Sequence, residues 1–106
     1  LDGKYSAEVF SENIPILPEA RKCAENFIIT AGGQLNRNYL QDKIDFKVKD
    51  FALEEVLYDP QTSGGLLISL PEEEAYGLLE KLNKLEIKSA IVGKVIERQE
   101  KDVIVL

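Results

Sequence analysis

The sequence predicts an α+β domain in which a mixed β-sheet carries two main helices packed on one face. Apolar residues recur at helical spacing in two long segments, and they alternate or cluster as in strands in five others. The order is strand, helix, strand, strand, helix, strand, strand, without an internal repeat or a low-complexity stretch. The 106 residues fit a single domain.

The amino-terminal half is predicted to hold a strand, a helix and a second strand. Residues 6–10 could form a short strand, and Pro18 stands near the first turn of the helix. One apolar helix face comprises Ala20, Cys23, Ala24, Phe27 and Ile28. The glycines of Ala31-Gly32-Gly33 are expected to end this helix, leaving residues 34–42 as a loop. From Ile44 to Val48, apolar and charged residues alternate as in a strand with one wet face.

The middle of the chain predicts a short helix, an interior strand and the second main helix. Residues 51–57 favour the short helix, and residues 66–70 are apolar on both faces, as in an interior strand. Pro71 opens the second main helix, in which glutamates crowd the amino end and lysines gather near the carboxyl end. Its buried stripe is expected to comprise Ala75, Leu78, Leu79, Leu82 and Leu85.

The carboxyl-terminal segment predicts two strands joined by a charged turn. Residues 89–97 and 102–106 have the strand pattern, and residues 98–101 form the turn between them. Gly93 lies inside the first of these strands. A glycine there predicts a bulge or a close approach of another backbone segment.

Composition limits the classes of function. With 19 acidic and 13 basic residues the net charge is −6, which disfavours nucleic acid as a partner. No apolar run is long enough to span a membrane and no export signal is recognisable, so a cytoplasmic location is expected. Cys23 is the only cysteine and histidine is absent, which excludes an intrachain disulfide and nucleophilic sites that need histidine. The chain contains no methionine and begins at Leu1, so we expect it to be part of a longer protein.

The loop Asp59-Pro60-Gln61-Thr62-Ser63-Gly64-Gly65 is the most distinctive stretch. Its hydroxyls and its two glycines could form a cradle for an anion, assisted by the Asp59 carboxylate. However, a phosphate-binding glycine loop normally opens a helix and carries a lysine, whereas this loop leads into a predicted strand. By mechanism alone a tight structural turn is favoured, and a ligand loop stays open.

Other candidate residues have structural explanations beside functional ones. Glu54, Glu55 and Asp59 could be imagined as a magnesium or acid/base group, although the solvated face of a short helix explains them more simply. Arg37, which follows Gly32-Gly33, could hold a carboxylate or a phosphate through two hydrogen bonds, or could lie in a solvated loop. Cys23 is interpreted as a small buried hydrophobic residue.

Four segments together resemble the carboxyl-terminal domain of the selenophosphate synthetase family, also called selenide, water dikinase. The longest is Asp59 to Ile68, followed after a helix by Ala90 to Val95. Ile14 to Ala20 and the pair Gly32-Gly33 with the following Arg37-Asn38 are also similar to segments of that family. The resemblance extends over nearly the whole chain from about Ala7.

The resemblance implies that residues 1–106 are a single domain, the carboxyl-terminal part of a longer two-domain enzyme of the aminoimidazole ribonucleotide synthetase superfamily. Such an enzyme makes selenophosphate from selenide, ATP and water, and releases AMP and orthophosphate, with magnesium bridging the phosphates. Its nucleophile, most nucleotide contacts and its metal ligands lie outside the stretch that this chain matches. The resemblance therefore gives this chain no catalytic or metal-binding residue, and Cys23 is not the family's nucleophile.

On this family basis, the chain should form one wall of an active site between two domains. The expected lining residues are Thr62, Ser63, Gly64 and Gly65. The implied partners are its own amino-terminal domain and a second copy in a full-length homodimer, with no nucleic acid and no membrane. The isolated chain is expected to be inactive, to hold no cofactor and not to bind Mg-ATP appreciably.

Two alternatives stay open at this stage. One is a sister enzyme of the same superfamily, which acts in hydrogenase maturation, thiamine-monophosphate phosphorylation or purine synthesis. The other is a non-enzymatic α+β module that binds a ligand or a partner. The module alone would be expected to bind its ligand without any further domain.

Overall fold

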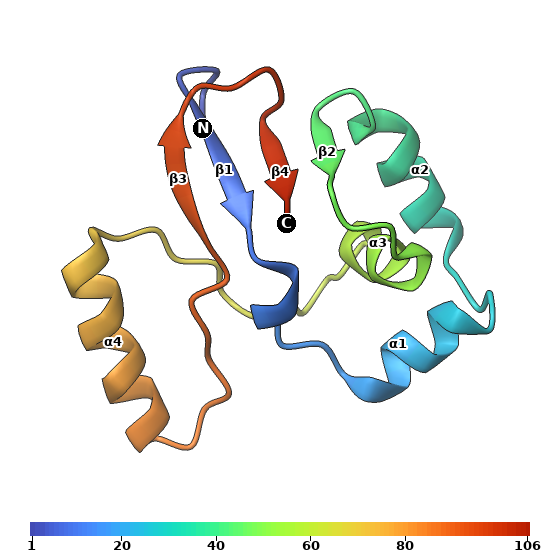
Figure 1. Cartoon of the computed structure of the whole chain (residues 1–106). Coiled ribbons are helices and arrows are strands. Elements are labelled where there is room, and N and C mark those ends of the chain that lie inside the picture. Colours follow the sequence, from blue (N-terminus) through green and yellow to red (C-terminus); the bar gives the residue numbers. More distant parts are fainter.

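The computed structural model describes all 106 residues (Figure 1). Its strands are β1 (Tyr5–Val9), β2 (Ile44–Phe46), β3 (Gly93–Glu97) and β4 (Val103–Val105). Its helices are α1 (Pro18–Glu25), α2 (Ala31–Leu40), α3 (Phe51–Tyr58), α4 (Glu72–Lys84) and the 3-10 helix η1 (Ser11–Asn13). The predicted α+β class is confirmed, with one mixed sheet and four α-helices. None of these helices is both long and apolar enough to cross a lipid bilayer.

The sheet is mixed, and its strands lie in the order β2, β4, β1, β3. β1 runs antiparallel to β3 and parallel to β4, and β4 runs parallel to β2. The two-residue period of a strand places Tyr5, Ala7 and Val9 on one face, which we call the apolar face. On that face Ala7 lies between Val95 of β3 and Val103 of β4. All four strands overlap segments predicted to be strands, so these predictions are confirmed.

Gly93 begins β3 where this strand passes very close to β1. A Cβ at this position would lie 2.2 Å from the carbonyl oxygen of Glu8 and 3.3 Å from the Cα of Val9. Only glycine fits between the two backbones without a shift of one strand. The predicted close approach at Gly93 is confirmed.

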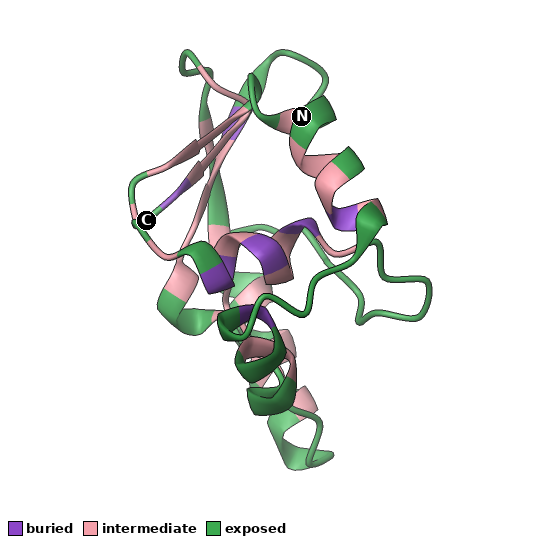
Figure 2. Ribbon diagram, turned by 90° about the vertical axis from the view of Figure 1, so that its right-hand side faces the viewer, coloured by how far each residue is buried: buried purple, intermediate pink, exposed green.

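Three of the helices pack together beside the sheet. α2 and α3 contact the half of the apolar face formed by β2 and β4, where the rings of Phe46 and Tyr58 lie 5.7 Å apart. α1 packs on α3 and contributes the buried residue Ala24. The buried apolar residues are Ala24, Ala52, Leu53, Tyr58 and Val105. Figure 2 shows these buried positions on the sheet and the packed helices, whereas α4 has none.

The prediction of one helix followed by a loop between residues 18 and 42 is wrong. α1 ends at Glu25, because Phe27 adopts a left-handed φ of 58° and the amide of Ile28 donates back to the Cys23 carbonyl at 2.9 Å. A new helix, α2, then begins at Ala31. Its amino end is capped by Thr30, whose hydroxyl accepts a hydrogen bond from the amide of Gly33. The two glycines therefore open a helix instead of ending one.

The prediction of an interior strand at residues 66–70 is also wrong. This segment has no regular secondary structure, and Leu66 and Leu67 are 92% and 88% exposed. The two interior positions of the sheet are held by β1 and β4, which each pair with a strand on both sides. Residues 66–70 pair with none of the four strands.

Two predictions about buried faces are corrected. α4 forms where Pro71, the first glutamates and the last lysines predict it, but its leucine stripe lacks the expected partner, and Leu85 is 67% exposed. Cys23 is exposed, while the neighbouring Ala24 is buried. The reason for the second error is that α1 turns Ala24 toward α3, so that Cys23 lies on the outer side.

Candidate functional site

The start of the 59–65 loop is attached to the amino end of α2. The hydroxyl of Thr30 donates to Oδ1 of Asp59 at 3.0 Å, and the same oxygen of Thr30 accepts from the amide of Gly33 at 3.0 Å. Nδ2 of Asn36 donates to the carbonyl of Tyr58 at 2.9 Å, one residue before the loop begins. The sequence segments around residues 32 and 59 therefore form one local structure.

Gly32 and Gly33 allow this close contact. A Cβ on Gly32 would lie 2.6 Å from Cγ of Pro60, closer than two non-bonded carbon atoms approach without a shift of one of them. A Cβ on Gly33 would lie 3.1 Å from the Thr30 hydroxyl and 3.7 Å from the Tyr58 carbonyl. The paired glycines thus bring α2 against the loop, and a larger residue at position 32 would move Pro60 away.

Beyond Pro60 the loop is open to solvent. Thr62, Ser63, Gly64 and Gly65 are all exposed, and neither hydroxyl has a hydrogen-bond partner in the chain. A Cβ on Gly65 would meet no atom within 4 Å. The loop continues into a segment without regular secondary structure and not into a helix, so it lacks the free helical amides of a phosphate cradle.

Arg37 does not face a ligand, because two carboxylates of α3 already hold it. Nη1 donates to Glu54 at 2.6 Å and Nη2 donates to Glu55, whose side chain is only 3% exposed. Nε2 of Gln34 donates to the other oxygen of Glu55 at 2.6 Å. The guanidinium lies 4.9 Å from the centre of the Tyr58 ring, and burial raises the pKa of Tyr58. This polar network joins α2 to α3 below the loop.

The same network excludes the acid cluster that the sequence allows. Glu55 is buried, so the prediction that it lies on the solvated face of a short helix is wrong. Asp59 is engaged with Thr30, away from the two glutamates that bind Arg37. No group of three acidic, cysteine or histidine side chains is arranged to hold a metal ion. The side chains of this chain therefore do not by themselves form a Mg²⁺ site.

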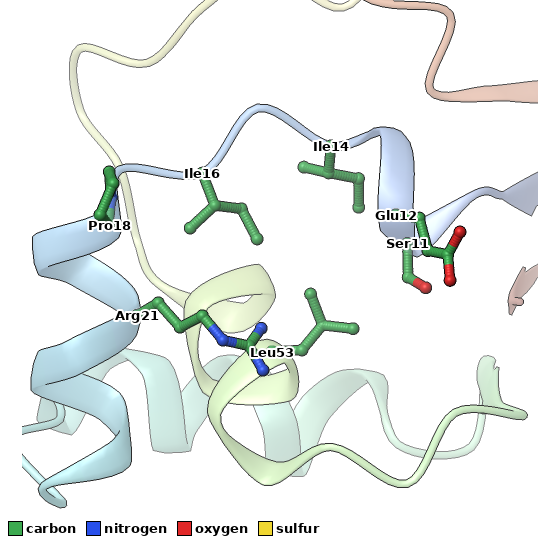
Figure 3. A pocket seen from close by; sticks show the side chains of 7 residues that line it. All are labelled: Ser11, Glu12, Ile14, Ile16, Pro18, Arg21 and Leu53. Carbon is green, nitrogen blue, oxygen red and sulfur yellow. The ribbon is translucent and has the colours of Figure 1, made fainter.

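A hollow of about 400 Å³ opens between η1, α1 and α3, and the sequence does not predict it. Figure 3 shows Ile14 and Ile16 above Leu53, with Arg21 at one side. Nη2 of Arg21 donates to Asp50 at 2.5 Å, and this contact lowers the pKa of Asp50. The hollow offers apolar contacts, and its one cation is already paired.

Two residues of the loop site are not among the residues predicted from the sequence. Thr30 and Asn36 anchor the start of the loop. Thr30 directly precedes the predicted helix stop, and Asn36 lies in the predicted loop. The sequence does contain a signal for Thr30. This threonine stands three residues before Gly33, which is the spacing at which a threonine hydroxyl caps the start of a helix. The lining residues Thr62 to Gly65 remain a prediction that the contacts of this chain do not test.

The whole chain, residues 1–106, matches the family model of the AIR synthase related protein, C-terminal domain. Selenide, water dikinase of Agathobacter rectalis is 41% identical over 101 residues, which is 94% of this chain and 30% of that protein. The protein of the same name in Caldanaerobacter subterraneus is 42% identical over 99 residues, covering 92% of this chain and 29% of that protein.

A third similar protein, selenide, water dikinase of Treponema denticola, is 42% identical over 101 residues, covering 91% of this chain and 28% of that protein. The chain therefore spans less than one third of the length of these curated relatives. The family match, by contrast, covers every residue. This chain belongs to the AIR synthase related protein family, and it corresponds to the carboxyl-terminal domain of that family.

Proposed function

We propose that this chain is the carboxyl-terminal domain of a selenide, water dikinase, an enzyme that forms selenophosphate from selenide, ATP and water and releases AMP and orthophosphate. The observation that carries the proposal is an identity of 35–42% to curated proteins of that name across more than nine-tenths of this chain. The loop from Asp59 to Gly65 supports it, because its start is built into the fold by Thr30 and by two glycines.

In this proposal the domain contributes one wall of an active site, and the chemistry belongs to the remainder of the enzyme. The exposed hydroxyls of Thr62 and Ser63 are without partners in the chain, so they are available to donate to an anionic group. Such contacts position a phosphate but do not activate a nucleophile. Because this chain has no suitable metal ligands, Mg²⁺ and ATP would be held mainly by residues outside it.

The partners and the location belong to the same proposal. The domain would face its own amino-terminal domain, in a full-length homodimer in the cytoplasm, and would contact neither nucleic acid nor membrane. The net charge of −6 supports the absence of nucleic acid, since a phosphate backbone would be repelled. The isolated chain would then be inactive.

The test uses the complete gene product that contains this chain, and the measurement is AMP formation from ATP with selenide. The double substitution Thr62→Val and Ser63→Ala removes both loop hydroxyls at nearly constant size. Loss of hydrogen bonds to a charged group should lower kcat/KM by about tenfold or more. Ser69→Ala is the matched control, because Ser69 is exposed on the same segment but lies outside the loop.

Two outcomes would argue against the proposal. If the double variant is as active as the parent, the two loop hydroxyls do not contribute to the active site. ATP turnover that does not depend on selenide would favour a sister enzyme of the superfamily. Calorimetry of the isolated chain with Mg-ATP addresses the remaining alternative, since micromolar binding would favour a self-sufficient ligand-binding module.

A further inference from the structure

A second hollow, of about 220 Å³, lies between the sheet and the helices α2 and α3. Ten residues line it, and none of them is exposed. The strands contribute Phe46, Val103 and Val105, among others, and the helices contribute Leu40 and Leu57. Because eight of the ten lining residues are apolar, the space suits an uncharged molecule.

The size of this hollow matches a small organic ring. An apolar cavity of about 150 Å³ is large enough to hold benzene. Water is a poor occupant of such a space, since a buried water molecule needs roughly two to four polar partners. The leucine, valine and phenylalanine side chains of this lining offer none. The apolar part of the hollow is therefore matched better by a hydrocarbon than by water.

A hydroxyl at this hollow has no partner in the chain. Tyr58 lines the hollow and is only 4% exposed, yet its hydroxyl makes no hydrogen bond. This hydroxyl is not completely enclosed, because every completely enclosed side-chain polar atom of the chain has a partner. The ring is fixed by Phe46, whose ring centre is 5.7 Å away, and by the guanidinium of Arg37 at 4.9 Å. Burial raises the pKa of Tyr58, so the hydroxyl keeps its proton and can donate it to a ligand.

Two other polar residues of the lining leave acceptor atoms free. Asp59 uses Oδ1 to accept from Thr30, and its Oδ2 has no partner in the chain. Asn36 uses Nδ2 to donate to the Tyr58 carbonyl, and its Oδ1 has no partner either. One donor and two acceptors at the same hollow match a ligand hydroxyl, which both accepts and donates. An anionic ligand does not fit, because the carboxylate of Asp59 repels it.

We propose that this hollow is a binding site for a small uncharged molecule that combines an apolar ring with one hydroxyl group. The ring occupies the space between β4, α2 and α3, and the ligand hydroxyl accepts from Tyr58 and donates to Asp59 or Asn36. Asn36 and Asp59 also fix the start of the 59–65 loop, so the ligand contacts the residues that hold this loop. The site does not depend on the reaction proposed above, and its test needs no enzyme assay.

Fluorine NMR titrations of the complete gene product that contains this chain test the proposal with three probes that share one ring. The probes are 4-fluorophenol, fluorobenzene and 4-fluorobenzoate. We expect 4-fluorophenol to bind with a dissociation constant of about 1 mM or lower. Fluorobenzene lacks the hydroxyl and should bind about threefold to tenfold more weakly. The carboxylate of 4-fluorobenzoate would be buried beside Asp59, so this probe should not bind.

Three variants locate the probes in the hollow. Tyr58→Phe removes the hydroxyl and keeps the ring, so it should abolish the preference for 4-fluorophenol over fluorobenzene. Val103→Phe enlarges a lining side chain and should weaken the binding of both uncharged probes about tenfold or more. Ile104→Phe is the matched control, because adjacent residues of a strand point to opposite faces of the sheet, and it should change neither affinity. Circular dichroism of each variant reports whether the fold is intact.

Four results would each overturn the proposal. The first is the absence of binding by both uncharged probes, and the second is equal binding of 4-fluorobenzoate and 4-fluorophenol. The third is a preference for 4-fluorophenol that persists in Tyr58→Phe, and the fourth is equal weakening by Val103→Phe and Ile104→Phe. If Val103→Phe does not fold, the comparison of the three probes on the parent and on Tyr58→Phe decides alone.

Discussion

Two parts of the chain, the body (residues 5–60 and 91–106) and the arm (residues 61–90), place the same residue types in opposite environments. In the body, Glu55 is 3% exposed and is held by Arg37 and Gln34. On the arm, the ion pair of Glu80 and Lys84 leaves both side chains more than 70% exposed. The body thus fixes the start of the 59–65 loop through a buried polar network, whereas the end of the loop belongs to a segment with few constraints. The 59–65 loop is therefore held firmly at its start and not at its end.

The largest expected effect comes from removing one cation in each region. Arg37→Met leaves the buried Glu55 without its cation, and we expect the free energy of unfolding to fall by about 3 kcal/mol. Lys84→Met breaks an exposed pair and should cost less than about 0.5 kcal/mol. Urea denaturation of both variants measures the difference. Equal costs would show that the polar network does not distinguish the body from the arm.

Two glycines give an effect of opposite sign in the two regions. Gly32→Ala places a methyl group against Pro60 and should destabilise the chain by about 1–2 kcal/mol. Gly77 lies within α4, where a Cβ would meet no atom within 4 Å. Gly77→Ala should therefore favour the helix by about 0.5–1 kcal/mol, seen as higher helicity in circular dichroism. A stabilised Gly32→Ala variant would mean that Pro60 does not lie against α2.

The third effect depends on pH. Asp50 caps α3 by accepting from the amide of Leu53, and the hydrogen bond from Arg21, followed by that from Leu53, lowers the pKa of its carboxyl. A lowered folded pKa means that ionised Asp50 stabilises the fold above its unfolded pKa near 4, and that this stability is lost as the pH falls through the folded value.

Asp50→Ala should consequently cost about 1 kcal/mol at pH 7 and progressively less below about pH 4. Free energies of unfolding of the parent and the variant, measured side by side from pH 7 to pH 2, check this. A cost that stays constant with pH would show that the charge of Asp50 contributes nothing. No such dependence is expected for substitutions of uncharged residues on the arm.

The smallest effect is expected for a substitution at Cys23 of α1, and the adjacent Ala24 supplies the contrast. Cys23 is exposed, so Cys23→Ser should change the free energy of unfolding by less than about 0.5 kcal/mol. Ala24 is 4% exposed, and Ala24→Leu should cost about 1–3 kcal/mol through overpacking against α3. Alkylation of the native chain at Cys23 is an independent check. A thiol that reacts only after denaturation would place Cys23 in the core.

Local signals predicted the elements that depend on local physics. Pro71 with its glutamates and lysines predicts α4, the apolar alternation predicts β2, and Gly93 predicts the close approach to β1. The pair Gly32-Gly33 leads to a wrong prediction, because glycines after an apolar helix face usually indicate its end. Here they allow Pro60 to pack against the start of α2, a contact that the sequence alone does not reveal. The strand prediction at residues 66–70 fails since strand order depends on which segments occupy the sheet interior.

The candidate site also has a part that the sequence predicts and a part that it does not. The loop from Asp59 to Gly65 is recognisable from its motif alone. Its attachment is not, because Thr30 lies 29 residues from Asp59, and Asn36 lies 22 residues from Tyr58. Arg37 shows the converse, since its residue type suits an anionic ligand but its partners Glu54 and Glu55 are supplied by the fold. Which polar residues remain available to a ligand is decided by tertiary contacts.

The most direct test of the proposed function is phosphorus NMR of the products formed by the complete gene product from ATP, with and without selenide. The proposal predicts selenophosphate, AMP and orthophosphate in equal amounts when selenide is present, and no AMP when it is omitted. A well-folded protein that consumes no ATP with selenide, or that forms AMP and orthophosphate from ATP equally well without selenide, would contradict the assignment of this chain to a selenide, water dikinase.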